Sequence, residues 1–168
     1  LPGIISEIAW ETTAQNNATN NFNDFSIKIG CTSQTELTQS FEQGLTQVFS
    51  PQDISVSLGW NNFQLNPGYM WDGFSNLIVE ICFDNLDTMY TGNWSTPFEA
   101  TNYNSTNYHR SDALLSCQEN YGNTAVSRRP ITRFTTFELQ RDTGFVLQWS
   151  PTNDLTNSNI LNPIATPT

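Results

Sequence analysis

Hydrophobic and polar positions alternate along several short stretches of the chain. In residues 25–31 the apolar side chains occupy odd positions and polar or small ones occupy even positions, and residues 54–60 repeat this pattern. A period of two places one side of a strand on a core and the other side in water, as in antiparallel sheets. Residues 77–83 are apolar on nearly both sides, which predicts a central strand. Weaker strand patterns occur at 4–10, 62–65, 131–139 and 145–149.

The segments that link these stretches are rich in residues that form turns. Asn, Asp, Gly and Pro gather at 16–23, 66–68, 72–73 and 120–123, where they favour tight changes of chain direction. Many short strands separated by such turns predict an all-β fold, an antiparallel β-sandwich of the jelly-roll type.

One segment has the spacing of a helix. Leu37, Phe41 and Leu45 recur at every fourth residue within 36–48, as they would on one face of a helix. Gly44 and several β-branched residues weaken the helical tendency of this segment. We therefore expect at most one or two short helical turns.

Composition divides the chain into a β-domain and a polar end. Residues 1–149 contain all of the strand patterns and no internal repeat, and a chain of this length fits one domain. Residues 150–168 are rich in Asn, Thr and Pro, with few apolar residues. This composition predicts a polar tail or linking segment.

Charge and composition narrow the class of protein. Six basic residues stand against 16 acidic ones, for a net charge of −10, so the chain lacks the basic surface that nucleic-acid binding requires. No apolar stretch is long enough to span a membrane. Asn, Thr and Ser supply about one residue in three, Lys28 is the only lysine, and aromatic residues reach 12%. Such a chain can form a core, and its composition is that of an extracellular β-protein.

The three cysteines allow one disulfide within the chain. We expect it between Cys82, at the end of a strong strand pattern, and Cys117, in a polar loop, with Cys31 left over. The alternative is three buried thiols that pack as small hydrophobic residues. No Cys-x-x-Cys pair is present, and His109, the single histidine, is next to no cysteine, so we expect no structural zinc site.

The sequence contains no recognisable catalytic motif, and we expect no catalytic residue. His109 is the only imidazole base and lies in a polar stretch, and no Gly-x-Ser-x-Gly surrounds a serine. A pair of catalytic carboxylates remains an alternative, because the sequence does not show which acidic residues lie close together in space. Asp84 and Asp87 flank Asn85 and could offer oxygen ligands to calcium, although a solvated turn is the favoured explanation. We expect no other cofactor.

Aromatic rings can bind the apolar faces of sugars. Four of the five tryptophans fall in strand patterns or beside a turn, which favours packing in the core. Trp94 has a more loop-like setting and is the candidate for sugar contact, although aromatic residues also pack beneath loops.

Four stretches together resemble a known domain. They lie at residues 23–30, 59–63, 70–85 and 129–131, and the most specific piece is Trp-Asp-Gly-x-Ser-Asn-Leu within the third. Over roughly residues 3–134 the chain is similar to a β-sandwich domain of secreted Bacteroidetes surface proteins, which include large adhesins and gliding- or type IX secretion-associated proteins. This family has no established catalytic motif. The resemblance implies export, display outside the cell or at its surface, and an adhesive or structural role.

Four residues are candidates for attached sugar. Asn17, Asn93 and Asn104 each begin an Asn-x-Ser/Thr sequon in a predicted loop. Thr88, in Asp-Thr-Met, is similar to the O-glycosylation signal of secreted Bacteroidetes proteins. We therefore expect a glycoprotein.

The chain departs from the family pattern at both ends. Family members carry another strand before the segment that matches residues 2–10, and this chain continues after residues 129–130 rather than passing into another domain. A sandwich without its first strand would expose an unpaired edge and a hydrophobic groove. The alternating residues Phe145, Leu147 and Trp149 could fill such a groove, either within the chain, to give a monomer, or from a neighbour, to give a head-to-tail filament.

These observations favour a non-enzymatic extracellular protein, a glycosylated filament or surface-fibre subunit that joins copies of itself by exchange of a terminal strand. The alternative is a carbohydrate-binding module of a secreted protein. A secreted hydrolase that uses His109 or an acid pair is the third possibility.

Overall fold

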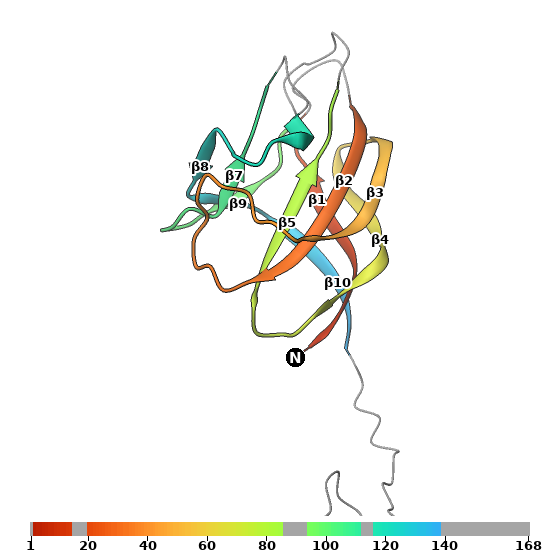
Figure 1. The fold of residues 1–168 in the computed structure, drawn as a ribbon. Coiled ribbons are helices and arrows are strands. Elements are labelled where there is room, and N and C mark those ends of the chain that lie inside the picture. Colours follow the sequence, from red (N-terminus) through yellow and green to blue (C-terminus); the bar gives the residue numbers. More distant parts are fainter. Residues whose placement is uncertain (1, 15–19, 86–93, 112–115, 139–168) are drawn as a thin grey trace, which may run out of the picture. The chain divides into compact units, whose positions relative to one another are not determined.

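The computed structural model of the chain describes residues 2–14, 20–85, 94–111 and 116–138, and its main body consists of two three-stranded sheets in two layers (Figure 1). All strand pairs in these residues are antiparallel. The first sheet has the order β10-β1-β4, with β10 at Thr132–Glu138, β1 at Gly3–Thr12 and β4 at Gly59–Trp71. The second has the order β3-β2-β5, with β3 at Thr46–Ser55, β2 at Asn21–Thr32 and β5 at Asn76–Cys82.

The prediction of an all-β, antiparallel sandwich is confirmed by these two layers. The more specific jelly-roll connectivity stays a prediction. The expected boundary between residues 149 and 150 lies outside the described residues.

Two small sheets and one helical turn complete the described fold. β6 (Phe98–Ala100) pairs with β9 (Arg128–Pro130), and β7 (Thr106–Tyr108) pairs with β8 (Thr124–Val126). Within the described ranges, the single helical turn is η1 (Ser116–Gln118).

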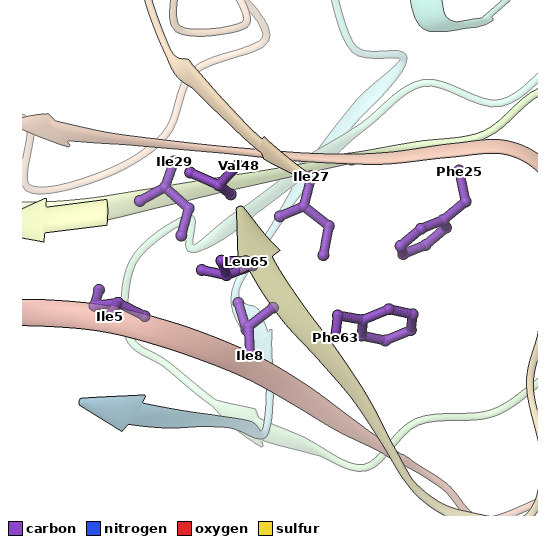
Figure 2. Packing of buried hydrophobic residues seen from close by; sticks show 8 residues of the cluster. All are labelled: Ile5, Ile8, Phe25, Ile27, Ile29, Val48, Phe63 and Leu65. Carbon is purple, nitrogen blue, oxygen red and sulfur yellow. The ribbon is translucent and has the colours of Figure 1, made fainter. Parts of the chain in front are cut away.

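The core lies between the two layers, and its side chains come from four strands (Figure 2). The alternation along β2 explains this burial, because Ile27 and Ile29 face the core whereas Lys28 between them points to the outer face. The rings of Phe25 and Phe63 stack across the layers, with their centroids 5.0 Å apart. The members of the core cluster are Ile5, Ile8, Phe25, Ile27, Ile29, Val48, Phe63 and Leu65.

Two of the strand predictions need correction. Residues 54–60 are not one strand, because β3 ends at Ser55 and β4 begins at Gly59. Gly59 has a φ of 93°, a backbone conformation that glycine adopts readily and other residues rarely adopt. In the connection between them Val56 is buried but Leu58 is 61% exposed, so the apolar alternation of the sequence does not keep one face on the core here. Residues 77–83 do contribute β5, but within the described part of the chain this strand lies at a sheet edge and β2 is the central one.

The helical spacing at 36–48 does not produce a helical turn. The N–H of Leu37 donates to the carbonyl of Asn104 at 2.7 Å, and the N–H of Phe41 donates to the carbonyl of Asn120 at 2.9 Å. These bonds to distant segments replace the bonds between residues four apart that define a helix. The spacing of the three apolar residues therefore reflects how a loop packs on its neighbours.

Candidate functional site

The edge strand β10 carries an apolar side chain that the core does not fully cover. Phe134 of β10 lies opposite Ile8 of β1 in the register, so both side chains share the inner face of the sheet. Ile8 is fully buried, whereas Phe134 is 38% exposed. The inner face of this sheet is therefore not fully covered at β10.

β5, at the edge of the other sheet, shows the same relationship. Ile81 of β5 lies opposite Ile27 of β2 and so points to the inner face. Ile27 is fully buried, but Ile81 is 42% exposed. The edge strands β5 and β10 thus each carry an inner-facing hydrophobic residue that is exposed to water.

These two residues belong to the same side of the sandwich. β3 and β4 contact each other and are joined by the short connection 56–58, and their inner residues Val48, Phe63 and Leu65 are buried. β5 and β10 are the opposite edge strands of the two sheets. We call this side, defined by Ile81 and Phe134, the β5–β10 edge.

The main chain of β10 is also suited to bind another strand. Within the described residues β10 pairs only with β1, and six of its seven residues are exposed. A strand that pairs on one side only presents N–H and C=O groups that can form a ladder with an added strand.

The outer face of the same sheet carries a second apolar surface. Met70 of β4 and Phe137 of β10 flank Ile4 of β1 in the register, and both are exposed. A strand added beside β10 would therefore have exposed apolar neighbours on both faces of the sheet. Phe134 lies on the inner face and Phe137 on the outer face.

No family model, curated protein or solved structure matches this chain. No helix in the described ranges has the length and apolar character that crossing a membrane requires. The geometry of the described residues therefore carries the functional argument.

A disulfide ties β5 to the helical turn η1. It joins Cys82 to Cys117, the pair expected from the sequence, and their Cα atoms lie 5.5 Å apart. Cys31 is an exposed free thiol, which accepts a hydrogen bond from the Tyr69 hydroxyl at 3.4 Å. Burial and this hydrogen bond raise the pKa of the Tyr69 phenol to about 12.

Trp94 is half-buried rather than displayed as a flat platform. Its indole Nε1 is buried and has no hydrogen-bond partner among the described residues. The polar edge of this ring is therefore not available to a sugar in this conformation. Trp149 lies outside the described residues, and the other tryptophans (Trp10, Trp60 and Trp71) are half-buried.

Asp84, a calcium candidate, holds the main chain at the end of β5. Its Oδ1 accepts a hydrogen bond from the N–H of Ser116 at 2.9 Å, and its own N–H donates to the carbonyl of Asn23 at 3.0 Å. The described residues contain no group of three or more His, Cys, Asp or Glu that could hold a metal ion. Asp87, the second calcium candidate, lies outside them.

His109 lies near a serine. Its Nδ1 is 3.2 Å from the Oγ of Ser116, which is the spacing of a nucleophile and its base. Asp84, which is close by, binds the main chain of Ser116 and not the imidazole. The prediction that the chain is not an enzyme stays a prediction.

Asn104 is the only sugar-attachment candidate within the described residues. It is half-buried, its Oδ1 accepts a hydrogen bond from Ser127 at 3.4 Å, and its main-chain carbonyl binds Leu37. The hydroxyl of Thr106, the last residue of its sequon, donates to the carbonyl of Arg128 at 2.6 Å. The other candidates (Asn17, Thr88 and Asn93) lie outside the described residues, as do Phe145, Leu147 and Trp149.

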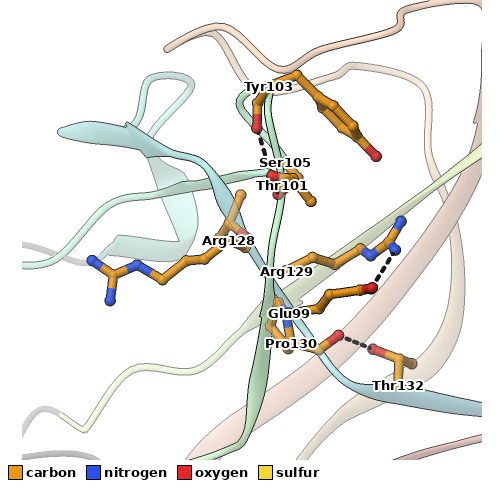
Figure 3. Close-up of polar contacts among 9 residues, drawn as sticks. Glu99, Thr101, Tyr103, Ser105, Arg128, Arg129, Pro130 and Thr132 are labelled. Atoms are coloured by element: carbon orange, nitrogen blue, oxygen red, sulfur yellow. Dashed lines mark hydrogen bonds and ion pairs between the residues drawn. The ribbon is translucent and has the colours of Figure 1, made fainter.

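The arginines on β9 and β10 contact side chains of the protein itself. Arg129 pairs with Glu99 of β6 at 3.0 Å, as Figure 3 shows. The Arg128 guanidinium lies 5.3 Å from the centroid of the Phe98 ring, within the range of a cation–π contact. These contacts brace the small β6-β9 sheet.

A polar hollow on the outer face of the second sheet surrounds an ion pair. Lys28 of β2 contacts Glu80 of β5 at 2.7 Å, and the hollow is also lined by Phe41, Leu45 and Asn120. Because the charge of Lys28 is already matched by Glu80, this hollow offers no unpaired cation to an anionic ligand.

An open edge is expected from the sequence, but the pattern does not single out Ile81 or Phe134. Both residues lie inside predicted strands, at 77–83 and 131–139, and a period of two correctly places such residues on an inner face. Their exposure follows from the order of strands in each sheet, which the pattern of residues within one strand does not specify.

Proposed function

We propose that this chain is a non-enzymatic extracellular protein with a structural or adhesive role, a glycosylated subunit of a filament or surface fibre. In this proposal, neighbouring copies join when a terminal strand of one subunit pairs with an open sheet edge of the next. The observation that carries it is Phe134, which lies on the inner face of an edge strand and is 38% exposed beside a fully buried Ile8.

The energetics favour covering this edge. Complete burial of a Phe or Ile side chain stabilises by roughly 1.5–3 kcal/mol, so covering the exposed parts of Phe134 and Ile81 would contribute about 1 kcal/mol each. Main-chain hydrogen bonds along β10 would add roughly 0.5–1.5 kcal/mol each. These favourable contributions offset the free-energy cost of association, which arises because two subunits lose translational and rotational freedom.

The composition and the family resemblance support the extracellular setting. Side chains with amides and hydroxyls are more frequent in the chain than charged ones. One disulfide links two segments of the fold, and disulfides are common in proteins outside the cytosol. The resemblance to secreted Bacteroidetes surface domains supports display at the cell surface and a role in attachment.

Two deletions test the proposal. One chain lacks residues 150–168 and the other lacks residues 145–149, and both are compared with the intact chain by electron microscopy and by light scattering. We expect filaments from the intact chain and none from the chain without 145–149, because that deletion removes Phe145, Leu147 and Trp149. Polymers that survive both deletions unchanged would exclude strand exchange.

A carbohydrate-binding module is the alternative from the sequence. It requires an accessible ring at Trp94, whereas the Nε1 of this residue is buried, and we therefore favour the fibre subunit. Polysaccharide affinity that disappears in Trp94→Ala would favour the alternative.

A further inference from the structure

The β5–β10 edge has the properties of an acceptor for one strand. Its two partly exposed inner residues, Ile81 and Phe134, each lie beside a fully buried isoleucine of the neighbouring strand. The next inner position of β10 is Thr136, which lies opposite the buried Ile5 and is also exposed. An apolar strand laid along β10 would extend the inner layer by one row.

We propose that the occupant of the β5–β10 edge is residues 145–149 of a second copy of this chain, paired along β10 with Phe145, Leu147 and Trp149 on the inner face. This inference rests on the proposed function, and it adds the acceptor edge that the function leaves open.

The donor segment fits this edge in pattern and charge. Phe145, Leu147 and Trp149 recur with a period of two, and the five residues carry no charge. Alternate side chains of a strand point to the same face, so these three would lie together beside Phe134. Pro151, which cannot donate a ladder hydrogen bond, marks the end of such a strand.

The turn chemistry of the segment after β10 favours a second copy over the same chain. To place Leu147 beside Phe134, residues 145–149 of the same chain would have to reverse direction soon after Glu138, at Gln140 and Arg141. The turn-forming residues come later, in Asp142-Thr143-Gly144. A hairpin with its turn there would place residues 145–149 opposite 137–141, beyond Phe134.

Disulfide trapping between two chains tests the assignment. One tagged chain carries Phe134→Cys and a second, differently tagged chain carries Leu147→Cys, both with Cys31→Ser to remove the free thiol. Leu147 is central in the donor, so it lies near Phe134 whether the donor runs parallel or antiparallel to β10. The chains are mixed, assembled and oxidised with copper–phenanthroline, and the products are identified on non-reducing gels and by mass spectrometry of the linked peptides.

We expect a linked product that contains both tags. Thr135→Cys is the matched control, because Thr135 lies opposite Glu7 and points to the outer face. Its yield with Leu147→Cys should be about tenfold lower, whereas it should link to Gln148→Cys, which faces the opposite way from Leu147. If the Phe134→Cys chain does not fold, Thr136→Cys takes its place in the experiment.

The outcomes separate this inference from the proposed function. Filaments that assemble but give no link from Phe134→Cys or Thr136→Cys would overturn the acceptor assignment and leave strand exchange at another edge. A link that forms inside single chains of the double variant, without a second copy, would show that the chain covers its own edge. If the intact chain never polymerises, both the function and the inference fail.

Discussion

The guanidinium carbon of Arg133 lies 3.8 Å from the centroid of the Trp60 ring. Arg133 belongs to β10 and Trp60 to β4, and Ala9 of β1 lies between these strands opposite Arg133. Ala9 is fully buried although it is on the outer face. The stacked pair therefore covers Ala9 and holds the edge strand β10 to its sheet.

Removal of this contact should loosen β10. We expect Arg133→Ala to lower the free energy of unfolding by about 1 kcal/mol, because a cation–π pair contributes roughly 0.5–2 kcal/mol and the aliphatic part of Arg133 is lost too. Urea unfolding of Arg133→Ala, Trp60→Leu and the double variant gives the coupling energy. Arg110→Ala is the control, and additive single effects would contradict the pairing.

The Cys82–Cys117 disulfide should contribute substantially to stability. It closes a loop with a sequence separation of 35 residues, for which the loss of chain entropy in the unfolded state predicts about 3–4 kcal/mol. Replacement of both cysteines by serine should lower the Tm by on the order of 10 °C. Calorimetry measures this change, and Cys31→Ser should leave the Tm almost unaltered because Cys31 forms no disulfide.

The pKa of Tyr69 should lie well above the ordinary value of a tyrosine. Burial and the Cys31 contact raise its pKa from 10 to about 12, so the folded state holds this proton more tightly than the unfolded state does. The resulting stabilisation is complete below pH 10 and disappears as the pH rises through about 12. The difference in ultraviolet absorbance between the intact chain and Tyr69→Phe isolates this titration, and Cys31→Ala should shift it toward 10.

Asp72 should titrate below its ordinary value. The Ser75 hydroxyl and the N–H groups of Phe74 and Ser75 donate to its carboxylate, and these bonds lower its pKa, the hydroxyl most of all. Stability from Asp72 is therefore present above the ordinary pKa and lost as the pH falls through the lowered one. Carboxyl NMR should show the pKa rising in Ser75→Ala, whereas Ser50→Ala should not move it.

The strands that follow strict alternation were predictable from sequence, and the others show what a local pattern omits. Residues 25–31 fall within β2 because Phe25, Ile27 and Ile29 all reach the core. Residues 54–60 show the same alternation in sequence, but the strand breaks there: Leu58 is exposed and Gly59 takes a positive φ. A period of two cannot reveal such a break.

Features that depend on distant partners were harder to predict. The spacing within 36–48 resembles a helix, yet its main chain bonds to Asn104 and Asn120, which are far away in sequence. The candidate site depends on the same kind of information. Among the described strands, β5 and β10 lie at sheet edges, and Ile81 and Phe134 are partly exposed for that reason.

The position of Lys28 bears on how the folded chain withstands digestion. Proteases of the trypsin type cut after lysine or arginine, and Lys28 is the only such residue before Arg110. It lies in β2, hydrogen-bonded between β3 and β5, where a peptide cannot enter a protease cleft without local unfolding. The first hundred residues should thus persist as one fragment during digestion by proteases of this type.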